Sequence, residues 1–220
     1  MKQRSAAAVS DEFRTTATLA CTAGTLLLTE PDHRLLRCLL ETTDFQVGTL
    51  ETLRQAFYDR LCMPQSGLYV PPFEHVFRGG RKANGVWHFP PARADGALEV
   101  EAIYREQGFR HTTLNVAPLF RSAHLPGDHI GFMLIFLGWM LRARTGYDTA
   151  LCSLLGRFVA RHLDGWIEPF GERLCAGDTT GYLTAVAAAV SESAAELRRR
   201  LPPIRSQARQ RTKAGIGTGG

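Results

Sequence analysis

Asp128 and His129 are the adjacent residues of this chain whose types and position could best support binding or acid–base chemistry. They stand in "LPGDHIGFMLIFLGWML", between a Pro-Gly turn and a strongly apolar run. An aspartate in front of a helix is typical of an N-cap, which accepts hydrogen bonds from first-turn amides and contributes about 1 kcal/mol. A carboxylate at the mouth of an apolar core could equally bind a guanidinium group in a planar, often bidentate way. Both the structural and the recognition interpretation are open at this point, and His129 could be an ordinary half-exposed histidine.

Metal binding and catalysis are the other interpretations of this pair. The histidines at 75, 88, 111, 124 and 129 form no His-Glu-x-x-His motif, and the five cysteines form no Cys-x-x-Cys pair. No Gly-x-Ser-x-Gly elbow supplies a nucleophile, and "FRGGRKANG" fits no phosphate-binding pattern. We therefore expect no metal, no cofactor and no catalytic residue. A small helical hydrolase that uses Asp128, His129 and Glu74, with or without a metal, is the alternative.

The positive charge of the chain is concentrated at its end. Residues 198–220 hold seven of the 26 basic residues and no acidic one, so the remainder carries 19 basic and 21 acidic side chains. The segment 202–220 begins with two prolines and ends in "KAGIGTGG", which predicts a disordered basic, Gly-rich tail after a domain of residues 1–201. We expect no nucleic-acid partner. An adaptor that binds nucleic acid through this tail is a third, less favoured hypothesis.

Several features indicate a cytoplasmic protein without a membrane span. The longest apolar run, Ile130 to Leu141, has 12 residues, whereas a helix that crosses a bilayer needs about 20. Charges at Asp11, Glu12 and Arg14 interrupt the N-terminal apolar residues, so we expect no secretory signal. An odd number of scattered cysteines is typical of free thiols in a reducing compartment.

Apolar residues recur at helical spacing over most of the chain and predict an all-α, single-domain bundle of roughly seven helices. We expect Ser10 to cap the first helix, Asp95 to cap another, and Gly108 to end the latter. The predicted helices cover residues 10–30, a segment after Pro31, 50–61, 96–107, 128–144, 149–163 and 178–201.

The segment 130–141 is apolar around nearly its whole circumference, which predicts a buried central helix. Gly131 and Gly138 lie seven residues apart in it. Each costs about 1 kcal/mol of helix propensity relative to alanine. Such a cost is reasonable where a neighbouring helix approaches closely, so we expect a close helix contact at both glycines.

Residues 63–95 form a long segment rich in proline, glycine and aromatic residues, without convincing helical or strand periodicity. Long connections of this kind are usually functional or disordered. The aromatic residues argue against disorder, because so much ring surface normally packs against something. Trp87 and Tyr69, both in this segment, are therefore candidates for contact with a partner.

Two motifs together resemble the TorD/DmsD/NarJ-type chaperones of molybdoenzyme maturation, and the DmsD branch most closely. The first is "GLYVPPFEHVF", and the second, some fifty residues later, is "LPGDHIGFMLIFLGWML". The resemblance extends more weakly through "WIEPF" and covers roughly residues 11–200. Met133 stands where TorD-branch members often have glutamate, so any role of that acid is not available here.

The resemblance implies an all-helical, cofactor-independent cytoplasmic chaperone. Such a protein binds the twin-arginine signal peptide of a molybdopterin-dependent oxidoreductase subunit and holds the apoenzyme until its cofactor is inserted, which prevents premature export. It also implies a monomer or a domain-swapped dimer. By motif, Asp128 and His129 become signal-peptide contacts, Pro71, Pro72 and Phe73 form part of the binding loop, and Glu74 is a second acid. Tyr69 and Trp87 complete the set of eight expected signal-peptide contacts.

Overall fold

Helices account for most of the chain in the computed structural model, which describes residues 6–42, 47–121, 125–143 and 148–201. The all-α, single-domain prediction is confirmed. The α-helices are α1 (Ala6–Leu28), α2 (His33–Thr42), α3 (Leu50–Phe57), α4 (Glu74–Arg78), α5 (Leu98–Gln107), α6 (Ile130–Arg142), α7 (Thr149–Phe158), α8 (Ile167–Cys175) and α9 (Tyr182–Arg200). One-turn π-helices extend α3 (Tyr58–Cys62) and α7 (Val159–Leu163), and β1 (Arg81–Ala83) pairs with β2 (Val86–His88) in an antiparallel hairpin.

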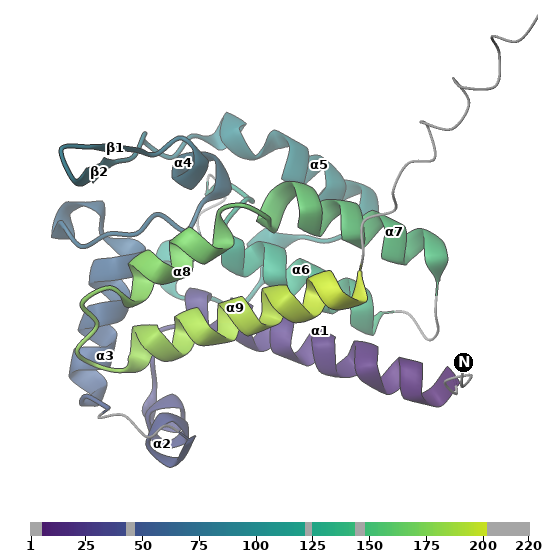
Figure 1. Ribbon diagram of the computed structural model, residues 1–220, viewed down its shortest axis with the longest axis horizontal. Helices are drawn as coiled ribbons and strands as arrows, with labels where there is room; N and C mark the ends of the chain where they lie inside the picture. The colour runs from purple at the N-terminus through teal and green to yellow at the C-terminus, as the bar shows by residue number, and fades with distance from the viewer. Residues whose placement is uncertain (1–5, 43–46, 122–124, 144–147, 202–220) are drawn as a thin grey trace, which may run out of the picture.

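The central helix is α6, as predicted. It lies near the middle of the molecule in Figure 1, where α1 packs along it and α9 in turn packs against α1. Phe132, Leu134 and Phe136 are fully buried, so apolar contacts surround much of the helix. None of the helices in the described ranges has the length and apolar content that a membrane span requires.

The α1–α6 contact is close because glycines line it on both sides. A Cβ placed on Gly138 would lie 2.5 Å from Cys21 Sγ and 2.7 Å from the backbone oxygen of Ala17. On α1, a Cβ on Gly24 would lie 2.6 Å from the backbone oxygen of Gly131. The expected close approach at Gly131 and Gly138 is therefore confirmed.

Several predicted helix boundaries were wrong. The first helix begins at Ala6 rather than at Ser10, and the helix after Asp95 has Ala97 at its N-cap, with no capping side chain. The predicted end at Gly108 is confirmed, because Gly108 adopts the left-handed conformation (φ 75°) that suits glycine. The last helix begins at Tyr182 and not at Asp178. The Asp178 carboxylate accepts hydrogen bonds from Thr180, which precedes the helix, and from Thr184, which lies in its first turn.

Three elements were not expected from the sequence. The long segment 63–95 contains α4 and the β1–β2 hairpin, whose Asn84 and Gly85 both have positive φ, as a tight two-residue turn requires. Strands of three residues are too short to show alternation.

The helix α8 contains Pro169 and Gly171 and so has the composition of a loop. Pro169 is tolerated because amides of the first turn have no intrahelical partner. The predicted tail 202–220 lies outside the described residues.

Candidate functional site

The segment before α4 is joined to the start of α6 by two backbone hydrogen bonds. Phe73 and His129 form an isolated antiparallel bridge. The Ile130 amide donates to the Pro72 oxygen over 2.8 Å, and the Glu74 amide donates to the Asp128 oxygen over 3.1 Å. The two sequence motifs, more than fifty residues apart, therefore meet in space.

Asp128 is buried at this joint, with a residue exposure of 1%. Its Oδ2 accepts a hydrogen bond from the backbone amide of His75 (2.8 Å) and another from His75 Nδ1 (2.6 Å). Asp128 therefore caps the first turn of α4, and the prediction that it caps α6 was wrong. Its Oδ1 is buried and has no hydrogen-bond partner among the described residues, so this carboxylate is only half satisfied.

The hydrogen bonds of His75 define its tautomer. Nε2 accepts from the backbone amide of Arg93 over 3.0 Å, so the proton of the neutral ring resides on Nδ1 and is donated to Asp128. Asp128 thus pairs with His75, and not with its sequence neighbour His129. Because both nitrogens of His75 are engaged, this Asp-His pair does not present a base to a substrate.

Glu74 is a second carboxylate held by a histidine. Its Oε2 lies 2.9 Å from His162 Nδ1, and its Oε1 accepts from Arg78 Nε over 2.8 Å. The side chains of Glu74 and His162 are 13% and 5% exposed. Arg78 also donates to the backbone oxygens of Arg161 and Asp164, which fixes α4 against the turn after α7. Asp128 and Glu74 therefore form two neighbouring carboxylate–histidine pairs.

His129 has a structural role in this arrangement. It is the N-cap of α6, where its Nδ1 accepts from the Gly131 amide over 3.0 Å. The rings of Phe73, Phe120 and Phe132 surround it at centroid distances of 5.2, 5.0 and 5.3 Å. Its burial, together with the nearby His111, lowers the pKa of the imidazole to about 3. His129 is therefore a neutral, fully buried ring, and the expectation of a half-exposed histidine was wrong.

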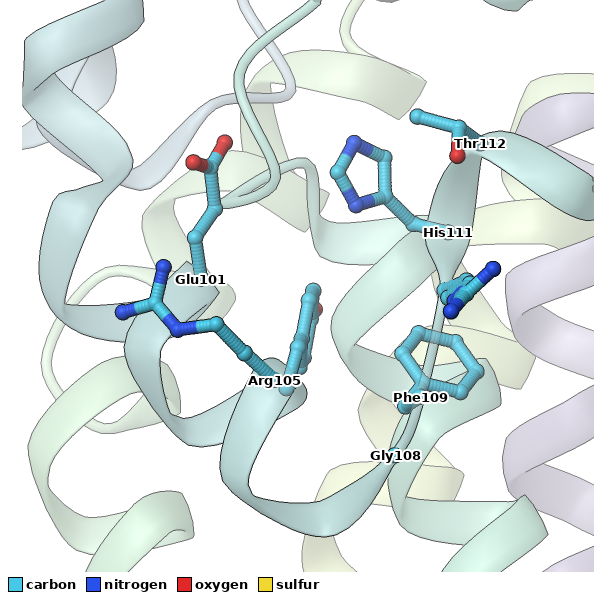
Figure 2. A pocket seen from close by; sticks show the side chains of 8 residues that line it. Glu101, Arg105, Gly108, Phe109, His111 and Thr112 are labelled. Carbon is cyan, nitrogen blue, oxygen red and sulfur yellow. The ribbon is translucent and has the colours of Figure 1, made fainter.

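A pocket of about 360 Å³ lies beside the turn that precedes Asp128. Figure 2 shows Glu101 and Arg105 of α5 on one side of it and Phe109, His111 and Thr112 on the other. Glu101 Oε1 accepts from the Gly127 amide over 3.0 Å, so the pocket wall holds the residue next to Asp128.

Tyr104 and His111 also line this pocket, and Tyr104 connects it to the turn before Asp128. The Tyr104 hydroxyl donates to the Gly127 oxygen over 3.1 Å, and its burial, then the charge of Asp128, raises the pKa of Tyr104. Burial lowers the pKa of His111. Sequence reasoning missed Glu101, Tyr104 and His111, because the spacing of Glu101 and Tyr104 indicates only an amphipathic helix and His111 belongs to no motif.

Residues 27–172 match the model of the family described as "Nitrate reductase delta subunit". The chain belongs to this family. Its members are molybdoenzyme maturation chaperones of the NarJ/TorD type, which agrees with the resemblance seen in the sequence. No curated protein matches the chain.

The segment that matches the nitrate reductase delta subunit family contains all eight residues predicted as contacts. Of these, Pro71, Pro72, Phe73, Glu74, Asp128 and His129 come together at the joint. Tyr69 is half-buried, and burial raises the pKa of its hydroxyl. Trp87 lies in a different cluster, where it packs against Phe77, Phe89 and Arg173.

Within this delta subunit fold, the described residues contain no group of three or more His, Cys, Asp or Glu side chains placed to hold a metal ion. The carboxylates of the joint are instead engaged by imidazole and guanidinium groups of the chain itself. The arrangement therefore suits recognition of a cationic, hydrogen-bond-donating group.

Proposed function

We propose that this chain is a cytoplasmic chaperone, closest to the DmsD branch, that binds the twin-arginine signal peptide of a molybdoenzyme subunit. It holds the apoenzyme until the cofactor is inserted, as a monomer or a domain-swapped dimer. Membership of the maturation-chaperone family supports this proposal. The observation that carries it furthest is the half-satisfied Asp128 carboxylate, with Glu74 beside it.

An arginine of the peptide could donate the hydrogen bond that Asp128 Oδ1 lacks. The guanidinium group offers a planar fork of donors that can engage both carboxylate oxygens, whereas His75 engages only Oδ2. Because Asp128 is buried, this exchange requires the segment that carries His75 to move away from α6. Two backbone hydrogen bonds and the His75 contact hold that segment to the start of α6. In the proposal, the peptide arginine replaces His75.

The apolar part of the peptide needs a groove close to the same point. A groove of about 250 Å³ between α1 and α6 is lined by Leu28, Val116 and Ile135 among others. Leu28 also packs at Gly131, the second residue of α6, where an added Cβ would lie 2.7 Å from Leu28 Cγ. We place the apolar segment in this groove, where its burial would supply most of the affinity.

Asp128→Asn is expected to weaken binding of a synthetic leader peptide with an Arg-Arg pair before an apolar segment by about tenfold. Asparagine still accepts from the His75 amide, so the cap of α4 is kept while the charge is lost. Alanine would leave two donors of His75 without an acceptor and is a poorer test. Calorimetry measures the affinity, and a Lys-Lys leader should bind the native protein as weakly as the Arg-Arg leader binds the variant.

The matched control is Asp95→Asn, which removes an exposed carboxylate whose pair with Arg93 spans 3.5 Å at the surface. It should leave binding unchanged. If Asp128→Asn is folded and binds normally, the proposal fails. Should Asp128→Asn unfold, Glu74→Gln provides the second test, with normal leader binding again counting against the proposal.

A second prediction tests the apolar groove. Thr25 is exposed on the groove's α1 rim. Thr25→Lys should weaken leader binding by about fivefold, because it sets a charge against the apolar segment. Thr15, exposed ten residues earlier on the same helix, provides the control variant Thr15→Lys. Equal affinities of the two lysine variants would place the apolar segment elsewhere.

A further inference from the structure

The guanidinium group of Arg173, on α8, lies over the parallel rings of Trp87 and Phe89. Its guanidinium carbon is 5.3 Å from the centroid of Trp87 and 5.6 Å from that of Phe89. The two rings are stacked, with planes 4° apart and centroids 5.6 Å apart. A guanidinium held in this manner has few remaining conformations, so it is preorganised to present its donors to a ligand.

The charge of Arg173 is not compensated. Seven other arginines of the described ranges form ion pairs with carboxylates, but Arg173 pairs with none. Its Nε is buried and has no hydrogen-bond partner among the described residues. Burial, followed by the like charge of Arg60, lowers the pKa of Arg173. An unpaired, desolvated donor of this kind costs free energy, and a bound anion would offset the uncompensated charge of the same guanidinium.

Two further cations border the same place. Arg60 donates to the backbone oxygens of Arg173 (3.3 Å) and Ala176 (2.7 Å), which keeps its charge next to α8. Lys82 is the direct cross-strand partner of Trp87, so the two side chains leave the hairpin on the same face. The surface thus combines three cations with a stacked aromatic wall.

We propose that Arg173, Trp87 and Phe89, with Arg60 and Lys82 beside them, form a binding site for an acidic segment of a partner protein, whose carboxylate pairs with the Arg173 guanidinium. This site is separate from the joint at Asp128 and goes beyond the proposed signal-peptide function. A twin-arginine leader is cationic, so these cations would repel it. Trp87, predicted above as a signal-peptide contact, is assigned by this proposal to a different partner segment.

The observations favour a polypeptide over a polyphosphate partner. Nucleic acids are bound mainly through many contacts to successive phosphates. Two of the three cations have an acidic neighbour in sequence, Asp59 beside Arg60 and Glu172 beside Arg173, so the three do not provide such a track. One preorganised guanidinium beside an aromatic wall instead suits a single carboxylate with an apolar neighbour.

The test uses a blocked peptide of alternating glutamate and glycine, with a glutamine-for-glutamate peptide as the neutral control. Arg173 Nε–H, followed by NMR in arginine-labelled full-length protein, should shift on titration with the acidic peptide only. Arg173→Gln should weaken binding of this peptide by about tenfold, the loss expected for one bidentate charged pair. Arg173→Lys should restore only part of the affinity, because lysine keeps the charge but loses the fork.

The matched control is Arg157→Gln on α7, which removes an exposed arginine that donates to the hydroxyl of Ser153. It should leave acidic-peptide binding unchanged, and Arg173→Gln should leave leader-peptide binding unchanged. Absence of binding at millimolar acidic peptide, or equal binding of the glutamine peptide, overturns the proposal. So does tighter Arg173-dependent binding of inorganic phosphate or a short oligonucleotide. A melting curve that matches the native protein confirms that each variant is folded.

Discussion

Gly24→Ala is expected to lower the free energy of unfolding by about 3 kcal/mol, at the upper end of the usual cost of overpacking a core. The new Cβ would lie 2.6 Å from the backbone oxygen of Gly131 and 2.7 Å from Ile135 Cγ1. A backbone oxygen inside a buried helix cannot turn away, so α1 and α6 would have to separate. The gain in helix propensity, about 1 kcal/mol, is too small to offset this. Urea unfolding measures the change.

Gly171→Ala is the matched control for this prediction. Gly171 is also a buried helical glycine, but an added Cβ would meet its nearest neighbour, Ser191 Oγ, at 3.5 Å, an ordinary contact. Alanine should therefore stabilise α8 by about 1 kcal/mol. If both variants change stability in the same direction, the α1–α6 contact is looser than the structure shows.

Acid is expected to destabilise the fold well before the carboxylates titrate, because His129 is buried as a neutral ring. Its pKa is about 3 in the folded chain, against 6.5 for an ordinary histidine. Above pH 6.5 both states are neutral at this residue, and its full contribution to stability is present. Between these values the unfolded chain binds the proton and the folded chain does not. Stability should therefore fall by about 1.4 kcal/mol per pH unit below 6.5, or about 2 kcal/mol at pH 5.

His129→Asn tests this assignment, since asparagine can still accept from the Gly131 amide at the N-cap but does not titrate. Its unfolding free energy at neutral pH should be lower through lost packing, yet should change much less between pH 6.5 and 4.5. His111, whose pKa burial also lowers, would account for the dependence that remains. His88→Asn, on the exposed strand β2, should keep the native profile. An unchanged slope in His129→Asn would show that other groups cause the acid sensitivity.

The parts of the fold that the sequence predicted well are those encoded locally. Twelve consecutive apolar residues suffice to indicate that α6 is buried, and the cost of Gly131 and Gly138 within a helix indicates a close neighbour. The hairpin and α8 were missed because three-residue strands and a proline-containing helix have no distinctive periodicity. In both cases the segment is too short for its own sequence to indicate its secondary structure.

The candidate site depended on contacts that no local pattern contains. The motif placed Asp128 in the correct region, but its hydrogen-bond partner His75 is 53 residues away, so its cap of α4 could not be predicted. His162, the partner of Glu74, is 88 residues away in a helix whose spacing indicates only a packed face. Pairing partners at such separations follow from tertiary packing and not from the composition around either residue.

The position of α1 in the core has a consequence for how the protein is made. Its main contacts are with α6 and α9, and α9 begins more than 150 residues after α1 ends. At the usual rate of about 5–20 residues per second, the ribosome releases α9 roughly 8–30 s later than α1. Until α6 and then α9 have been synthesised, the apolar face of α1 lacks its native partners, and this exposed face makes the nascent chain prone to aggregation.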